Sequence, residues 1–176
     1  MDPIIIQYYK SPFGEMIIGS FKEKLCLSDW RYRNQRNLID KRITSGLNAE
    51  YFEGNSEFNH EVIHQLHEYF TGKRKEFNIP LQPVGSPFQV SIWNELLKIQ
   101  YGKTKTYHEL SLIHGNEKAI RAIAAANAAN SISIIIPCHR VLGSRGELTG
   151  YAGGINVKKR LLQLEKAAGF NQLELF

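Results

Sequence analysis

The sequence contains few cysteines and no long apolar run, and these absences narrow the possible functions. Among its 176 residues only Cys26 and Cys138 are cysteines, too few for a disulfide framework or a cysteine-based zinc site. The longest apolar stretch, residues 119–136, is interrupted by polar side chains and falls short of the roughly 20 apolar residues that span a bilayer. The first ten residues lack the basic region of a secretory signal. We therefore expect a cytoplasmic protein with free thiols and no membrane partner.

The excess of positive charge is confined to one half of the chain. Residues 1–85 carry 11 Lys/Arg and 11 Asp/Glu, whereas residues 86–176 carry 11 Lys/Arg and 6 Asp/Glu. The formal net charge of +5 therefore belongs to the second half. A local positive excess favours a polyanion such as DNA, although many domains that bind no nucleic acid share it.

Proline and glycine mark a boundary between two domains. Residues 80–87 hold three prolines and a Gly-Ser pair, which predicts an N-terminal domain over residues 1–85 and a C-terminal domain over residues 86–176. The first domain opens with three strand-like runs, at residues 4–9, 15–21 and 24–30.

The rest of the first domain gives weaker signals. Apolar residues at helical spacing predict a helix from about His60, with Asn59 as its N-cap and Gly72 at its end. Residues 76–81 are interpreted as one more strand, and residues 31–59 carry no clear pattern. This domain is therefore predicted to be a small β-sheet with a helix.

The second domain has mainly helical patterns. Pro87 begins a helix, Thr106 to Glu109 form a capping box for a short helix that Gly115 ends, and Asn116 caps a helix from about Glu117 to Asn127. Two short helices joined by a turn containing glycine resemble a helix-turn-helix. A β-rich run at residues 132–136 and a last helix from about Asn156 to Ala168 follow. The predicted fold class is α/β (α+β), with a mostly helical second domain.

The second helix of this helix-turn-helix is unusually rich in alanine. Its sequence, AIRAIAAANAAN, holds one charged residue, whereas a helix that reads bases in the major groove normally carries Arg, Gln or Asn. Tight packing in a core is one interpretation, and close approach to a minor groove is the other. In the second case Arg121 is the long side chain that reaches into the duplex.

Cys138, His139 and Glu165 form a candidate catalytic set. Pro137 cannot continue a central strand, so the chain leaves the β-rich run just before Cys138. A thiol needs a base or a positive charge nearby to become a nucleophile, and His139 can act through a bridging water. Glu165 lies on the predicted core-facing stripe of the last helix, where a histidine N–H is a suitable partner. A buried structural cysteine and a cysteine hydrolase remain alternatives on this evidence.

The second domain resembles the O6-alkylguanine-DNA alkyltransferase (methylated-DNA–protein-cysteine methyltransferase) family. The string IPCHRV, at residues 136–141, is the active-site signature of that family. Tyr107, Arg121, Asn130 and Glu165 stand at the family positions between Phe88 and Glu165. The resemblance implies a ribonuclease H-like layout for the first domain and a winged-helix-like layout for the second.

The resemblance also implies a reaction and residue roles. An alkyl group on O6 of guanine in double-stranded DNA would be transferred irreversibly to Cys138, once per protein molecule. Before the transfer, a helix-turn-helix in the minor groove would flip the base out. Whether O4-alkylthymine is also accepted stays open. His139 would take the thiol proton through water, Glu165 would orient His139, Asn130 would brace the turn, and Tyr107 would rotate the base and donate to the leaving guanine. The DNA-binding residues implied are Arg121, Tyr107, Ala122, Ala125, Ala126 and Asn127. The pocket residues implied are Pro137, Val141, Tyr151 and Ala152. A monomer without cofactor or metal is expected.

Two positions depart from the family pattern and three other functions stay open. Ser131 follows Asn130 where many members have proline, and Ala152 stands where some have serine, so lesion preference and inhibitor sensitivity are not determined. A non-catalytic damage-binding protein would have the same fold, but such relatives lack the cysteine. A transcription regulator would need a second reading element, and a cysteine hydrolase would turn over.

Overall fold

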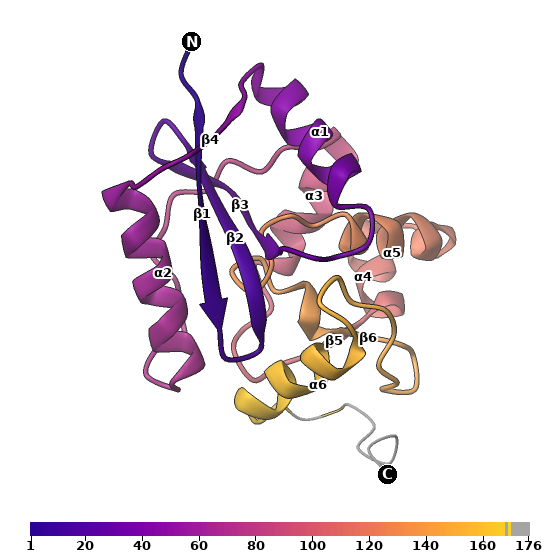
Figure 1. Cartoon of the computed structure of the whole chain (residues 1–176). Helices are drawn as coiled ribbons and strands as arrows, with labels where there is room; N and C mark the ends of the chain where they lie inside the picture. Colours follow the sequence, from indigo (N-terminus) through magenta and orange to yellow (C-terminus); the bar gives the residue numbers. More distant parts are fainter. Residues whose placement is uncertain (168, 170–176) are drawn as a thin grey trace. The chain divides into compact units, whose positions relative to one another are not determined.

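The computed structural model describes residues 1–167 and residue 169, and it divides into two compact units (Figure 1). The first unit contains Met1–Ser86 together with Ser131–Ile135. The second contains Pro87–Asn130 and the described residues from Ile136 to Ala167. Sequence patterns indicate a single boundary near residue 86, but they give no sign that five residues from the middle of the second domain belong to the first unit.

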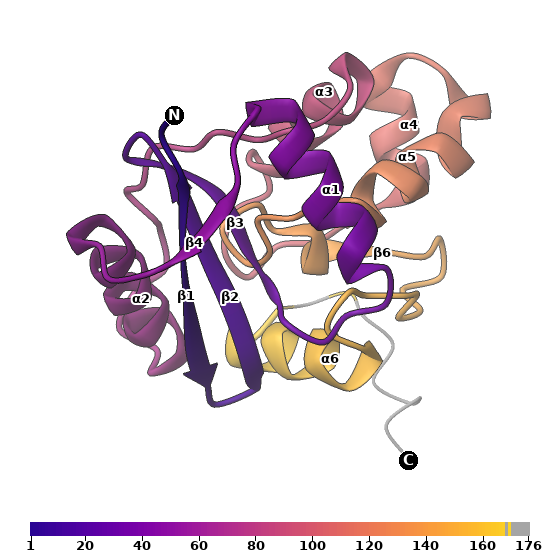
Figure 2. The ribbon, with the colours of Figure 1, turned by 45° about the horizontal axis from the view of Figure 1, so that its top comes forward.

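The first unit is built on a four-stranded sheet. Its strands are β1 (Ile4–Ser11), β2 (Gly14–Phe21), β3 (Lys24–Trp30) and β4 (Tyr51–Glu53), in the order β3-β2-β1-β4. The first three are antiparallel neighbours, and β4 runs parallel to β1. Helices α1 (Arg36–Leu47) and α2 (Glu57–Phe70) lie on opposite faces of this sheet (Figure 2). The three predicted strands of residues 4–30 are present.

Side-chain alternation explains how the helices pack on the sheet. Ile4 and Ile6 of β1 point to one face, where they join Ile39 and Ile43 of α1 in a hydrophobic cluster. On the other face, the ring of Tyr9 lies 6.4 Å from the ring of Phe70 on α2. Both faces of the sheet are therefore covered.

Two predictions for the first unit need correction, and one stretch without a prediction proves to be structured. The N-cap of α2 is Ser56, whose hydroxyl accepts the N–H of Asn59 at 3.2 Å; Asn59 lies inside the helix, and its side chain donates to the carbonyl of Ile5. Residues 76–81 form no strand, since only Leu81 makes an isolated bridge, to Leu25. The stretch without a pattern contains α1 and β4. No side chain caps α1, which explains the missing signal.

The second unit contains helices and a small two-stranded sheet. In chain order these are α3 (Pro87–Leu96), β5 (Lys105–Thr106), α4 (Tyr107–His114), the 3₁₀ helix η1 (Glu117–Ala119), α5 (Ile120–Ala128), the 3₁₀ helix η2 (Cys138–Arg140), β6 (Val141–Leu142) and α6 (Ile155–Leu164). Strand β5 pairs with β6 in parallel. No helix within residues 1–167 is long and apolar enough to cross a membrane.

The predicted helix-turn-helix is confirmed. The Thr106 hydroxyl accepts the N–H of Glu109 at 3.0 Å, and the Glu109 carboxylate accepts the N–H of Thr106 at 2.8 Å, so the capping box is complete. Gly115 ends α4 with a φ of 85°, and Asn116 caps the following 3₁₀ turn by accepting the N–H of Lys118. The second helix therefore begins as η1 and continues as α5.

Two predictions near the active-site signature were wrong in detail. Residues 132–136 are not a strand: Ile132 makes an isolated bridge to Ser28, and Ile134 then turns with a φ of 74°. The last helix ends at Leu164, so Glu165 is its C-cap residue, and the predicted end at Ala168 lies outside the described residues. The cysteine therefore follows a turn rather than a strand.

Candidate active site

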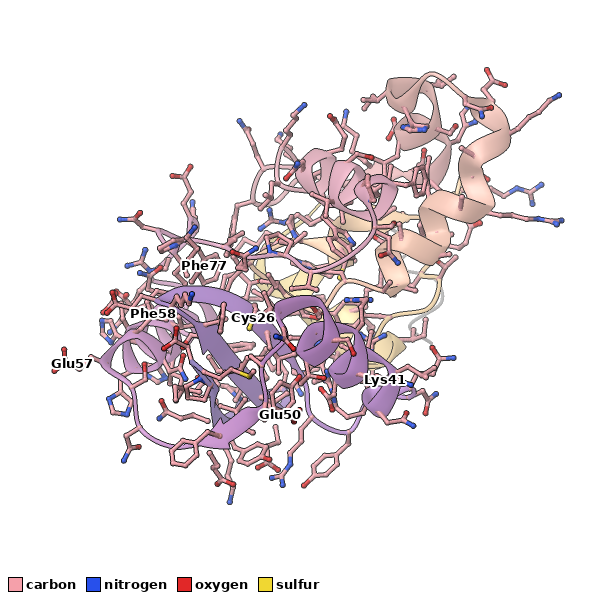
Figure 3. The ribbon with its side chains drawn as sticks, turned by 90° about the horizontal axis from the view of Figure 1, so that it is seen from above. Cys26, Lys41, Glu50, Glu57, Phe58 and Phe77 are labelled. Atoms are coloured by element: carbon pink, nitrogen blue, oxygen red, sulfur yellow. The ribbon has the colours of Figure 1, made fainter. Side chains whose placement is uncertain are left out.

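The two cysteines differ in their capacity to react. Cys26 lies on β3 inside the first unit (Figure 3), where its thiol donates to the carbonyl of Gly19 at 3.5 Å. Burial raises the pKa of the Cys26 thiol to about 12, so this sulfur stays protonated at neutral pH. Cys138 is the first residue of η2, and its backbone N–H donates to the carbonyl of Ile136 at 2.8 Å. Cys138 is therefore the candidate nucleophile.

His139 is buried beside Glu165, and only one of its two ring nitrogens bonds to that carboxylate. Its Nε2 lies 2.9 Å from Oε1 of Glu165. A carboxylate can only accept, so Nε2 carries the proton and Nδ1 presents a lone pair. Within the described part of the chain, Nδ1 is buried without a hydrogen-bond partner. Burial lowers the pKa of His139, against the opposing effect of Glu165, so the ring is neutral and can accept a proton at Nδ1.

Arg140 completes the ion pair that sequence analysis did not predict. Its Nε and Nη2 donate to the two oxygens of Glu165 at 2.9 and 2.7 Å, and Nη1 donates to the carbonyl of Ile99 at 2.6 Å. Burial alone would raise the pKa of Glu165, but His139 and Arg140 together hold it well below the usual range. The carboxylate thus stays ionised. The cost of burying a guanidinium next to His139 was the available signal that a carboxylate must serve both residues.

Tyr107 lies in a small polar network with the cysteine segment. Its phenol oxygen accepts from Asn127 Nδ2 and from Thr149 Oγ1, both at 3.3 Å. Asn127 Nδ2 also lies 3.4 Å from the carbonyl of Cys138. Burial raises the pKa of Tyr107, so the phenol keeps its proton and can donate it to another group.

Asn130 closes the segment that passes through the first unit. Its side-chain amide donates to the carbonyl of Ile136 at 2.9 Å and is buried. Residues 130 and 136 are the two points where the chain leaves and re-enters the second unit. Between them, Ser28 exchanges backbone hydrogen bonds with Ser131 and Ser133 at 2.9 and 2.6 Å. The turn before Cys138 is therefore held at both ends.

Helix α5 has an exposed face and a buried face, and the residues predicted to bind DNA are divided between them. Arg121, Ala122 and Ala125 are exposed. Ala126 and Asn127 are buried: the Ala126 carbonyl accepts the indole N–H of Trp93, and Asn127 belongs to the Tyr107 network. At 3.6 residues per turn, Asn127 faces away from positions 121, 122 and 125, whereas Ala126 lies one turn after Ala122, at the border between the two faces. The DNA contacts expected of Ala126 and Asn127 stay predictions, and both side chains are buried in this structure.

Two of the predicted pocket residues adjoin the 3₁₀ helix that begins with Cys138, and the other two lie in the loop before α6. Pro137 and Val141 are buried on either side of η2, and Tyr151 and Ala152 are half-buried in the loop before α6.

A further residue that sequence analysis missed, Lys158 on α6, is fully buried in the second unit. Its spacing of three and seven residues from Leu161 and Glu165 was the signal that it shares their inward face. Within residues 1–167 no three His, Cys, Asp or Glu side chains gather as a metal site.

Comparison with known proteins identifies relatives of both units. Residues 4–83 match a family model described as "6-O-methylguanine DNA methyltransferase, ribonuclease-like domain", and residues 87–167 match its "DNA binding domain". The methylated-DNA–protein-cysteine methyltransferase of Methanosarcina acetivorans is 51% identical over 89% of this chain and 95% of its own length. The constitutive enzyme of Bacillus subtilis is 36% identical over 92% and 96%.

A solved structure shares the fold. The crystal structure of Mycobacterium tuberculosis OGT in complex with DNA is 35% identical, with a TM-score of 0.80. The likeness covers 98% of this chain and 99% of that one.

Proposed function

Because the chain belongs to the methylated-DNA–protein-cysteine methyltransferase family, whose members repair DNA by alkyl transfer, we propose that it moves the alkyl group of O6-alkylguanine in double-stranded DNA onto Cys138. The observation that carries this assignment is the buried set of Cys138, His139 and Glu165 in the second unit. It supplies a sulfur nucleophile, a neutral imidazole with a lone pair at Nδ1, and an ionised carboxylate at Nε2.

The transfer step follows from these positions. The thiol proton passes through a bridging water to Nδ1 of His139, and Glu165 stabilises the imidazolium that forms. The thiolate of Cys138 then attacks the alkyl carbon: the S–C bond forms, the C–O6 bond breaks, and its electron pair stays with guanine. The Tyr107 phenol donates toward the departing base, and the proton lost by the thiol ends on guanine. Thiol and alkylguanine thus become thioether and guanine.

The product explains why each molecule acts once. A thioether has no acyl carbon for water to attack, so nothing in this set of residues releases the group from sulfur. A cysteine hydrolase would instead process more than one equivalent of substrate. The number of lesions repaired per protein molecule therefore separates these two functions.

Access to O6 requires that the base leave the stack. A buried sulfur cannot reach O6 inside a duplex, so we infer that the guanine is flipped out. The exposed face of α5 supports this, because Ala122 and Ala125 allow close approach to a minor groove, and Arg121 is the long side chain beside them. Arg121 would fill the space that the base vacates.

The first test is the intact mass of the protein after incubation with a duplex that carries O6-methylguanine. We expect a gain of one methyl group in proportion to the lesion, and the same gain in Cys26→Ala, since that thiol is buried and protonated. Cys138→Ala should gain nothing while still binding DNA. A methylated Cys138→Ala protein would refute the assignment, and lesion binding without any mass change would indicate a damage-binding protein.

The second test concerns Arg121. Arg121→Ala should weaken duplex binding and lower the slope of log affinity against log salt by about 1, as expected when one positive charge that displaces counterions is lost from the interface. Lys41→Ala is the matched control, because it removes one exposed charge from α1 of the first unit (Figure 3). Equal effects of the two substitutions would contradict a DNA-binding role for α5.

A further inference from the structure

Lys158 is an ammonium group with no exposed surface, and it holds two distant backbone carbonyls. Its Nζ donates to the carbonyl of Val141 at 2.6 Å and to the carbonyl of Thr149 at 3.3 Å. Val141 follows directly after η2, and Thr149 contacts the phenol of Tyr107. The Lys158 side chain therefore joins the two ends of residues 142–148, the segment that leads from η2 and β6 to the Tyr107 network.

The charge of Lys158 has no carboxylate to balance it. Among the residues that the structure describes, Glu165 pairs with His139 and Arg140, and no acidic group pairs with Lys158. Burial lowers the pKa of Lys158 to about 8, and the negative charge available on Cys138 is the one influence that opposes this. Two carbonyl dipoles alone are a poor exchange for the hydration of an ammonium ion. A buried ammonium group without a counter-charge is therefore a candidate for a functional role of its charge.

We propose that Lys158 is a positioning residue for the transfer: it supplies the positive charge that favours the thiolate of Cys138 and fixes the loop between η2 and Tyr107. This inference rests on the proposed function. A thiol beside a cation in a dry site loses its proton more readily, because the field of the cation is poorly screened there. The same charge opposes a second positive charge on His139, so the imidazole starts neutral and ready to accept the proton.

The ionisable side chains that the structure describes around the cysteine segment come from several elements, and Tyr107 and Lys158 interact electrostatically with Cys138. These ionisable side chains are His139 and Arg140 on η2, Tyr107 on α4, Lys158 on α6 and Glu165 at the end of α6. Arg140 is already neutralised by Glu165, and Tyr107 keeps its proton. Lys158 is therefore the uncompensated cation of this set.

The test measures thiolate formation without DNA. Wild-type protein, Lys158→Met and Lys158→Arg are treated with iodoacetamide between pH 5 and 10, and the rate constant for Cys138 is followed by intact and peptide mass. For Lys158→Met we expect the midpoint of the profile to move up by about one unit, and the rate at pH 7 to fall about tenfold. Lys158→Arg, which keeps the charge, should retain the wild-type midpoint. Lys159→Met, the neighbouring and half-exposed lysine on α6, is the matched control.

Structural damage is distinguished from loss of charge by a second measurement. Thermal unfolding identifies any variant that fails to fold, and Lys158→Arg then carries the test, because a purely structural role would lower its reactivity while a charge role would preserve the midpoint. A folded Lys158→Met protein with the wild-type profile would overturn the proposal. If instead the wild-type protein gains no methyl group from O6-methylguanine DNA, the proposed function fails irrespective of these profiles.

Discussion

Replacement of Glu165 by glutamine should weaken both the fold and the chemistry. The Glu165 side chain is fully buried, and its carboxylate accepts from His139 Nε2 and from Arg140 Nε and Nη2. An amide keeps one acceptor oxygen and turns a donor toward groups that also donate, while the guanidinium of Arg140 stays buried without a counter-charge. Removal of one partner of a buried ion pair costs about 3–5 kcal/mol, a large share of the roughly 5–15 kcal/mol that stabilises a typical domain.

The pH dependence of this loss follows from the direction of the pKa shift. The pKa of Glu165 is lower in the folded protein than in the unfolded chain, so its contribution is complete above the unfolded pKa of about 4.3. As the pH falls toward the folded pKa, the carboxyl of Glu165 is protonated in the unfolded chain before it is protonated in the folded protein. This protonation stabilises the unfolded state, so the contribution of Glu165 to the free energy of unfolding disappears. The stability difference between wild-type protein and Glu165→Gln should thus be constant from pH 6 to 8 and narrow below about pH 4.

Urea denaturation at several pH values measures this difference, and Glu95→Gln is the control. Glu95 pairs with the exposed Lys98 on the surface, so its replacement should cost less than about 1 kcal/mol. Methyl transfer by folded Glu165→Gln should be slower by at least about 100-fold, since proton transfer to a positioned base contributes on that order. A stability loss equal to that of Glu95→Gln, or one that does not narrow in acid, would refute the role given to Glu165.

Three further substitutions test local features. Thr106→Ala removes the N-cap of α4 and should lower the free energy of unfolding by about 1 kcal/mol in urea titrations; no loss would mean that the capping box is not stabilising. Asn130→Ala leaves the buried carbonyl of Ile136 without its donor. It should lower the free energy of unfolding by about 1–3 kcal/mol in the same assay and slow methyl transfer; an unchanged transfer rate would mean that this hydrogen bond does not support the active site. Thr149→Val removes the donor to Tyr107 and should slow methyl transfer about 3- to 10-fold without altering iodoacetamide reactivity; equal losses in both assays would contradict a role through Tyr107.

Local patterns were sufficient for much of the second unit. The capping box at Thr106 and the glycine end at Gly115 depend on groups three or four residues apart, so the chain specifies them before any tertiary contact forms. The same locality misled the interpretation of α2, because Asn59 is an acceptable cap in isolation and Ser56 is a better one in the folded protein. The run at residues 132–136 has β propensity, but β3 provides only one bridge before the turn at Ile134.

The sequence by itself determined which residues are candidates for the chemistry: the signature around Cys138, the base His139 beside it, and the acid Glu165 at the end of the last helix. Only the tertiary structure decided which polar groups complete the site. The sequence neighbours of Arg140 and Lys158 do not reveal that these two side chains are buried, because their burial depends on partners 25 and 17 residues away. The hydrogen bond from Asn127 to Tyr107 also depends on the tertiary structure, because burial selects a helix face, and an alanine-rich helix shows too little contrast to reveal which face that is.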